Sequence, residues 1–262
     1  MKKHLIWAAA SAALLASCAK EETQTFTPAA TDLPQASITF VAEENADFTR
    51  AFFDNTTTTE AWEQSLSSLT VFCFEEGALV MRRNFTSAEL SSRRSTFALP
   101  RSTAGKSIEF YALANAAVDE NITTKTALLA LTEETPGSYN GTFANVSSKA
   151  LRSGGFLMSG TATKSIGAAG TTTEVAITLR RDVAKVAVQA SLSPAFADKY
   201  PGTVRITSVK LSRSAMQTPY FGGTPKTGAM TFTHTQTPGE TSGRFNALFY
   251  CFENAALASG RR

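Results

Sequence analysis

The stretch Val175-Ala-Ile-Thr-Leu-Arg-Arg-Asp-Val-Ala-Lys-Val-Ala-Val188 holds two runs of strand-forming residues with a short charged step between them. The first run covers residues 174–179 and the second covers 184–190. Both are rich in β-branched residues, which fit a pleated, half-buried surface. A segment rich in Gly, Ala and Thr precedes the pair at 167–173. We therefore predict that one β-domain ends near residues 179–182 and that another begins there.

Short strands of the same kind recur on both sides of this step. Gly77 separates two of them so closely that we predict a hairpin. Helical signals are few and short, at 60–66, 124–131 and 194–200. Short strands at regular spacing with turn residues between them favour a β-sandwich over alternating βαβ units. The predicted strands are residues 37–41, 69–74, 78–81, 95–99, 108–113, 138–143, 156–159, 174–179, 184–190, 204–211, 230–234 and 245–252.

The predicted fold is all-β, with an N-terminal sandwich at 37–179 and a C-terminal sandwich at 180–262. The second region has only four clear strands, which bury too little apolar surface for a stable core on their own. We therefore expect the C-terminal sandwich to be incomplete: either the chain is truncated, or a partner supplies the missing strands.

The first residues have the pattern of a secretion signal. Lys2 and Lys3 are followed by an apolar run at 5–15, which is too short to span a bilayer. The quartet Leu15-Ala-Ser-Cys18 then resembles a lipobox, in which small residues fit the peptidase cleft and the cysteine thiol accepts the lipid. We predict that residues 1–17 are removed and that Cys18 is lipidated. The alternative is an ordinary secretory signal that happens to contain a cysteine.

Residues 18–36 are predicted to form a lipidated tether. They lack a hydrophobic period and are rich in Thr, Pro, Ala and Gln, which is typical of a flexible linker. Lys20, Glu21 and Glu22 resemble the surface-export signal of Bacteroidetes lipoproteins. The alternative is that these charges merely keep the tether solvated.

Charge and cysteine content limit the possible functions. The formal net charge is +3, and it falls to +1 when the two lysines of the signal leave, so nucleic-acid binding is not supported. The remaining cysteines lie in apolar, strand-like runs, which favours buried free thiols, although pairing stays open. We interpret the basic pairs as solvated strand ends and loops. The two remaining cysteines are Cys73 and Cys251, and the basic pairs lie at 82–83, 93–94 and 180–181.

The sequence contains no constellation typical of an enzyme. Of its two histidines, His4 leaves with the signal and His234 stands alone. No Cys/His cluster has metal-ligand spacing, and the acidic pairs are sequence neighbours, which point to opposite faces of a strand. Phosphate-binding and nucleophile-elbow motifs are missing as well. We predict a protein without catalytic activity, cofactor or metal.

Three stretches together resemble the fimbrillin family, the subunits of the type V pili of Bacteroidales. The first is Thr49-Arg-Ala-Phe-Phe-Asp54, followed by Trp62-Glu63 and the strand at 69–72. The second is the stretch at 175–188, and the third is Phe249-Tyr-Cys-Phe-Glu-Asn254. The resemblance implies two tandem transthyretin-like β-sandwich domains. It also implies a non-catalytic fimbrial subunit or accessory protein that supports adhesion and is exported to the cell surface on an outer-membrane lipid anchor.

The resemblance further implies how such a subunit assembles. An arginine-specific protease cuts after Arg50 and before Ala51, which releases the N-terminal strand. Ile38 and Phe40 of that strand would plug a groove, and a strand from another fimbrial subunit would take its place. The alternative for Arg50 is an ordinary solvated loop residue. Stalk, anchor and tip roles stay open, as does the adhesion target.

A second functional hypothesis is a surface glycan-binding lipoprotein. Such a protein would present a platform of exposed aromatic side chains. The visible aromatic residues fall mostly at apolar strand positions, which favours a role in the core. They are Phe72, Phe74, Phe110, Tyr111, Phe249 and Phe252.

Overall fold

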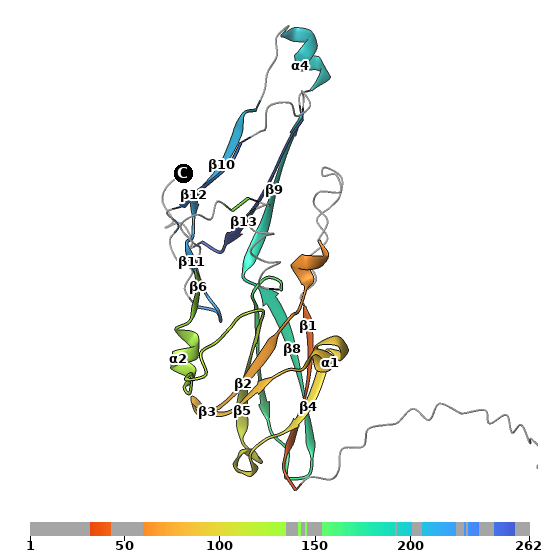
Figure 1. Ribbon diagram of the computed structural model, residues 1–262, viewed down its shortest axis with the longest axis vertical. Helices are drawn as coiled ribbons and strands as arrows, with labels where there is room; N and C mark the ends of the chain where they lie inside the picture. The colour runs from red at the N-terminus through yellow and green to blue at the C-terminus, as the bar shows by residue number, and fades with distance from the viewer. Residues whose placement is uncertain are drawn as a thin grey trace, which may run out of the picture. The chain divides into compact units, whose positions relative to one another are not determined.

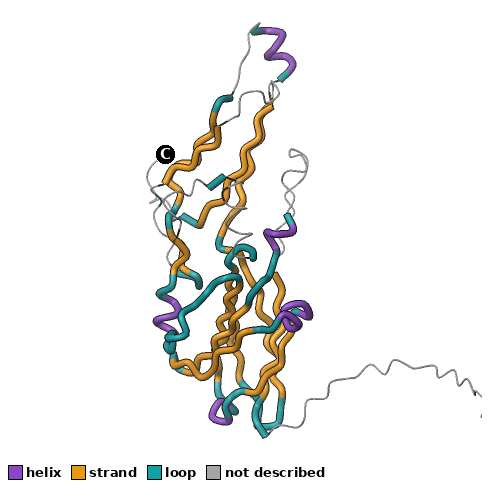
Figure 2. Tube along the Cα trace, in the orientation of Figure 1, coloured by secondary structure: helices purple, strands orange, loops and turns teal. Residues whose placement is uncertain are grey.

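The computed structural model of the chain is built mainly from β-strands, as Figures 1 and 2 show. It describes residues 32–42, 60–134, 141–142, 145, 154–191, 193–200, 206–223, 228, 230–235 and 244–254. All of these belong to one compact unit, residues 31–262. No described helix is long and apolar enough to cross a bilayer.

Thirteen strands are described, with a few short helices between them. The strands are β1 Gln35–Ala42, β2 Leu69–Glu75, β3 Ala78–Asn84, β4 Arg94–Ala98, β5 Ser107–Ala114, β6 Thr132–Glu134, β7 Met158–Ser165, β8 Thr172–Arg181, β9 Val183–Ser191, β10 Ser208–Ser214, β11 Gln217–Pro219, β12 Met230–Thr235 and β13 Arg244–Phe252. The helices are α1 Ser87–Ser92, α2 Lys125–Leu129 and α4 Pro194–Lys199, with 3-10 turns at Ala61–Gln64 and Arg101–Thr103.

Seven strands form one folded sheet in the order β3-β2-β5-β7-β8-β1-β4. The strands β7 and β8 pair only at Met158 with Arg181 and at Ser159 with Arg180, so the sheet turns a corner there. One hydrophobic core contains residues from β1, β4 and β8 as well as from β2, β5 and β7. Two faces around one core make a β-sandwich, as the sequence predicts.

The predicted hairpin is confirmed as the β2–β3 pair. Its two turn residues, Glu76 and Gly77, have φ values of 50° and 85°. Positive φ at both central positions is the geometry of a tight hairpin turn whose twist matches the flanking strands, and glycine adopts it without strain.

The stretch that crosses the predicted boundary forms β8 and β9, with Asp182 alone between them. The strand β9 pairs with β13 along its whole length, and β10 pairs with β12. Phe232, Phe245 and Phe249 form a second core among these four strands. Pairing also joins segments from the two sides of residue 180, because β6 pairs with β11 and Thr142 bridges to Phe249. The division into two tandem domains stays a prediction.

Most predicted strands are confirmed within a few residues, and three predictions differ from the structure. The strand expected at 156–159 begins at Met158 and runs on to Ser165, and the one expected at 204–211 begins at Ser208. The helix expected at 60–66 is a single 3-10 turn. Most of the strand expected at 138–143 lies outside the described residues. The sequence did not predict α1, β6 or β11.

Candidate strand-exchange site

The N-terminal strand β1 lies inside the sheet, between β4 and β8 (Figure 1). It runs antiparallel to β4, with Gln35 opposite Ala98 and Thr39 opposite Arg94. It runs parallel to β8, from Gln35 opposite Thr172 to Ala42 opposite Leu179. Backbone hydrogen bonds continue the pairing beyond the strand on both sides, at Pro34 with Leu99 (2.8 Å) and at Leu33 with Gly170 (3.2 Å). The main chain of β1 is therefore held on both sides.

One face of β1 is buried in the sandwich core. Ala36 and Ile38 are 0% exposed and Phe40 is 1% exposed. The Phe40 ring meets the edge of Phe85, with 5.7 Å between the ring centroids. Strand alternation places these three residues on the same face. Ile38 and Phe40, the predicted plug residues, thus both project into the core.

On the other face of β1, a long side chain crosses the strand. Arg94 of β4 donates from Nε to the Ser37 hydroxyl at 3.0 Å, and its Nη2 lies 2.8 Å from Glu174 Oε1 of β8. The arginine therefore reaches across β1 from one neighbouring strand to the other. Farther along, Val41 is 53% exposed. The strand has one apolar, buried face and one mainly polar outer face.

The other predicted site residues, Cys18, Arg50 and Ala51, lie outside the described residues. In the sequence, residues 43–59 connect β1 to the first 3-10 turn, and Arg50 is the one Arg or Lys in that connection. A cut at Arg50 would therefore divide the chain between β1 and every other described strand.

A buried carboxylate that the sequence analysis missed joins three parts of the chain. Glu63, in the first 3-10 turn, is 1% exposed. Its Oε1 accepts from the Tyr250 hydroxyl at 2.7 Å and from Lys185 Nζ at 2.8 Å, and its Oε2 lies 3.7 Å from Arg181 Nη1. Burial, followed by the hydrogen bond to Glu63, raises the pKa of the Tyr250 hydroxyl. An acid is tolerated here because opposite charges and a hydroxyl surround it.

Aromatic rings pack beside this carboxylate. Trp62 contacts Phe156 and Tyr250, with centroids 5.2 and 6.0 Å apart, and Phe156 lies 5.2 Å from Tyr250. Each of the three stretches that carry the family resemblance contributes to this cluster. The first supplies Trp62 and Glu63, the second supplies Arg181 and Lys185, and the third supplies Tyr250. The structure brings all three together at one buried cluster.

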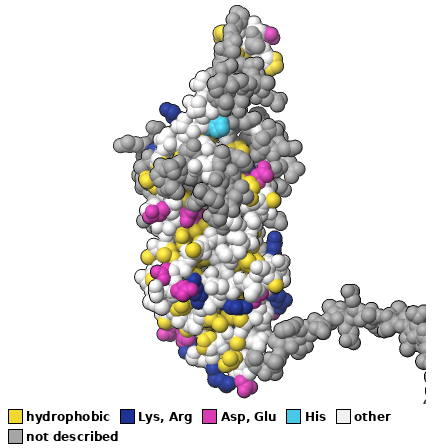
Figure 3. Space-filling model, viewed as in Figure 1, with side chains coloured by type: hydrophobic (Ala, Val, Ile, Leu, Met, Phe, Trp, Pro, Cys, Tyr) yellow, Lys and Arg dark blue, Asp and Glu magenta, His cyan; other side chains and the backbone are white. Residues whose placement is uncertain are grey.

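The interpretation of the basic pairs needs correction. Arg181 is partly buried beside Glu63. Arg82 lies within β3, where its guanidinium stacks on Phe72 at 5.2 Å and donates to two backbone carbonyls, and Arg83 pairs with Glu89 at 2.7 Å. Only tertiary contacts reveal these partners. On the face that Figure 3 shows, side chains of both charges lie interspersed.

Cysteine and histidine show no arrangement for chemistry in the described part of the chain. Cys73 is a buried free thiol whose burial raises its pKa to about 12, and Cys251 is free and partly buried. His234 lies in β12 with its ring against Phe245 and Phe249, at 5.7 and 6.3 Å. No group of three or more potential metal ligands occurs among the described residues.

Exposed aromatic side chains are scarce in the part of the chain that the structure describes, which bears on the glycan-binding hypothesis. Among the described aromatic residues, only Tyr200 is strongly exposed, and it packs against Phe196 with centroids 4.8 Å apart. A cavity of about 780 Å³ lies beside β7 and β8, lined partly by Tyr220, Arg180 and Glu253. The cavity lining holds two aromatic rings, the half-buried Tyr220 and the buried Phe221, and this does not make the expected exposed platform.

Comparison with known families identifies the chain. The sequence model of the fimbrillin-A associated anchor proteins Mfa1 and Mfa2 matches residues 31–256. The chain belongs to this family. The resemblance to fimbrillins is thereby confirmed, and the protein is a fimbrial subunit or accessory protein rather than a member of an enzyme family.

Solved structures of Bacteroidales proteins share the fold of this family member. A candidate cell adhesion protein from Parabacteroides distasonis aligns over 84% of this chain and 71% of its own, with 16% identity and a TM-score of 0.54. A fimbrial assembly protein from the same organism aligns over 84% of this chain and 76% of its own, with 12% identity and a TM-score of 0.51. A candidate adhesin from Bacteroides ovatus aligns over 87% of this chain and 71% of its own, with 12% identity and a TM-score of 0.50. The comparison with curated proteins gave no match.

Proposed function

We propose that this fimbrillin-family protein is exported as a surface lipoprotein through Cys18 and joins a fimbrium by exchanging its N-terminal strand. In this proposal an arginine-specific protease cuts between Arg50 and Ala51. The strand β1 then leaves the sheet, and a strand from another fimbrial subunit enters between β4 and β8. The assembled fimbrium supports adhesion.

The position of β1 is the observation that carries this proposal. The strand contributes Ala36, Ile38 and Phe40 to the core, yet residues 43–59 are its connection to the body. Its departure would leave two strands with unpaired backbone groups and an apolar floor between them. Such a groove favours strand addition, in which backbone hydrogen bonds give affinity and alternate side chains give specificity.

The proposal also accounts for the order of events. An open groove of this kind invites uncontrolled aggregation. While β1 is covalently attached, its high effective concentration keeps the groove filled. After the cut, the strand is held only by noncovalent contacts and can be replaced by an equivalent strand that belongs to another subunit.

The test is limited digestion of the folded protein with an arginine-specific protease. We expect Ala51 as the first new N-terminus and a body that stays folded and becomes able to oligomerise with partner subunits. The Arg50→Gln variant should resist both changes, whereas Arg101→Gln, a matched change at an exposed site, should behave as the wild type. Earlier cutting at Arg82 or Arg93, or a cut body that stays monomeric with partner subunits present, would refute the strand-exchange role.

A further inference from the structure

The edge strand β4 presents a mechanical problem for strand exchange. Among the described strands, β4 pairs only with β1. When β1 leaves, β4 loses its whole ladder, although it must remain in place as one wall of the groove. Contacts other than main-chain pairing must then hold it. This inference rests on the proposed function.

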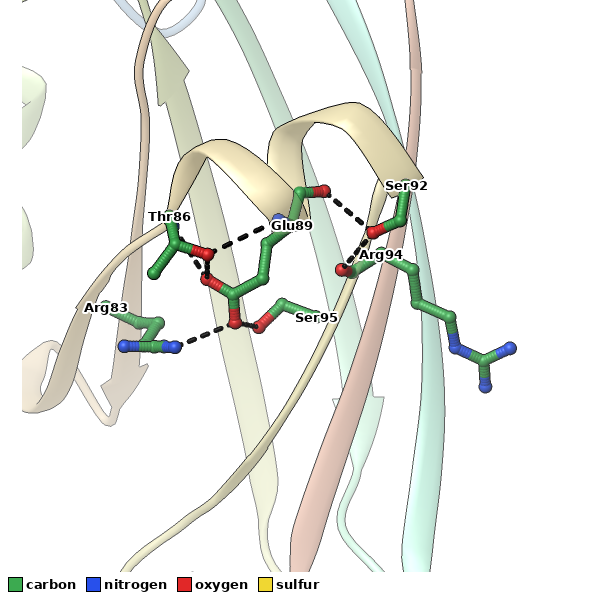
Figure 4. Close-up of polar contacts among 6 residues, drawn as sticks. All are labelled: Arg83, Thr86, Glu89, Ser92, Arg94 and Ser95. Atoms are coloured by element: carbon green, nitrogen blue, oxygen red, sulfur yellow. Dashed lines mark hydrogen bonds and ion pairs between the residues drawn. The ribbon is translucent and has the colours of Figure 1, made fainter. Parts of the chain in front are cut away.

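Glu89 supplies such contacts from the helix α1, which links β3 to β4 (Figure 4). Its Oε2 accepts from the Thr86 backbone N–H at 2.7 Å and from the Thr86 hydroxyl at 2.9 Å, and Thr86 Oγ1 in turn accepts from the Glu89 N–H at 3.3 Å. This reciprocal capping box fixes the start of the helix, and the bond from the Thr86 backbone N–H orients the carboxylate. The second oxygen, Oε1, remains for contacts outside the helix.

Oε1 joins the two ends of the seven-stranded sheet. It accepts from Arg83 Nη2 of β3 at 2.7 Å and from the Ser95 hydroxyl of β4. Ser95 is 3% exposed and lies opposite Ile38 in the β1–β4 register. One carboxylate therefore connects the edge strand β3 to the edge strand β4 at the level of the plug.

The pKa of Glu89 agrees with this geometry. Partial burial alone would raise it, but hydrogen bonds from Ser95, from the Thr86 backbone and side chain, and from Arg83 outweigh burial and lower the pKa to about 2. The carboxylate is therefore charged at neutral pH, and hydrogen bonds to a charged acceptor are the stronger kind.

The outer face of β4 offers a weaker attachment. Arg94 pairs with Glu174 across β1, but both side chains are more than half exposed, and exposed ion pairs contribute little. The second contact of Arg94, with the Ser37 hydroxyl, leaves together with β1. The inner contact of Ser95 with Glu89 is the better shielded of the two.

We propose that Glu89 is a positioning residue that holds β4 in place through Ser95 after β1 has left, so that the groove stays one strand wide and ready for an incoming strand. Glu89 and Ser95 thereby prepare the acceptor site, whereas Ala36, Ile38 and Phe40 fill it. While β1 is present, the β1–β4 ladder also holds β4, and the Glu89 contact is then one of several that fix this strand.

The experiment measures peptide uptake by the protease-cut protein. The folded protein is cut and keeps its own strand, and a fluorescein-labelled peptide of residues 33–42 is then titrated to displace that strand while anisotropy is recorded. Ser95→Ala removes the β4 contact and keeps the capping box, whereas Thr86→Ala weakens the capping box and keeps the β4 contact. Ser91→Ala is the matched serine control, because the Ser91 hydroxyl bonds only within α1, to Ser87 O at 2.9 Å. Melting temperatures of the uncut variants are recorded in parallel.

We expect Ser95→Ala and Glu89→Ala to bind the peptide about tenfold or more weakly than the wild type, the scale of one lost hydrogen bond to a charged group. Thr86→Ala and Ser91→Ala should stay close to the wild type. Uncut Ser95→Ala and uncut Thr86→Ala should both melt below the wild-type temperature, because each loses one hydrogen bond to the Glu89 carboxylate. A loss of peptide affinity that is confined to Ser95→Ala and Glu89→Ala then separates positioning of β4 from general stability. Wild-type affinity in Ser95→Ala would overturn the inference. So would equal losses in Ser95→Ala and Thr86→Ala, since helix stability alone would then explain both. If the cut wild-type body takes up no peptide, strand exchange itself fails, and the role of Glu89 fails with it.

Discussion

Truncation of Phe40 to alanine tests the plug directly. The side chain is 1% exposed and packs edge-on against Phe85. Removing a buried phenylalanine side chain costs about 3–5 kcal/mol, from lost hydrophobic transfer and from the cavity left behind. Val41, the next residue, is 53% exposed, so Val41→Ala should stay within about 0.5 kcal/mol of the wild type. The pair compares buried and exposed positions on the same strand.

Urea unfolding followed by circular dichroism measures the difference. Phe40→Ala should lower the transition midpoint without changing the slope, because the surface exposed on unfolding is nearly the same. The same change in the 33–42 peptide should weaken its binding to the cut body by roughly two to three orders of magnitude, since about 1.4 kcal/mol corresponds to a factor of ten. A loss below about 1 kcal/mol in Phe40→Ala, or equal effects of the two variants, would show that β1 does not plug the core through this side chain.

Further predictions concern the anchor, the buried cluster, acid stability and the lone histidine. Metabolic labelling with a palmitate analogue should mark the wild type and fail in Cys18→Ala, and a labelled, membrane-bound variant would contradict lipidation. Glu63→Ala should cost about 3–5 kcal/mol in urea unfolding because the carboxylate faces buried cationic and hydroxyl groups, whereas the exposed Glu60→Ala should cost little. The pKa of Glu89 is lowered from 4.5 to about 2, so the stabilisation that its carboxylate gives is complete above about pH 5 and is lost as the pH falls toward 2. The difference in free energy of unfolding between the wild type and Glu89→Gln should therefore narrow over that range. A difference that stays constant with pH would contradict this prediction. His234→Ala should leave stability and fibre assembly largely unchanged, and loss of a measurable activity would overturn the non-enzymatic interpretation.

Periodicity and turn residues predict the strands well because these signals are local. The β2–β3 hairpin follows from Gly77, and the strands β8 and β9 follow from their β-branched runs. Three-residue strands such as β6 and β11 carry too little pattern to detect. The helix α1 had a usable signal in Thr86 and Glu89, because Thr-x-x-Glu is a capping box.

The partners of β1 and the buried cluster depend on tertiary structure. The ladder places Gln35 opposite Thr172, a pairing that no local pattern specifies. Arg181 looks like a solvated residue until the fold brings Glu63 to it from 118 positions away. The family resemblance indicated which stretches matter, and only the structure shows that they meet.

The interior position of β1 bears on how an incoming strand would find its register. A strand between two neighbours regains two ladders on entry, whereas an edge strand would regain one. Along the buried face, the side chains grow from Ala36 through Ile38 to Phe40. A slip by two residues would bring the phenylalanine to the position of a smaller side chain, and overpacking of this kind costs about 1–3 kcal/mol. A slip by one residue would turn the apolar side chains to the outer face. In the proposed exchange, affinity therefore comes from the two ladders, and register comes from the gradient of side-chain size.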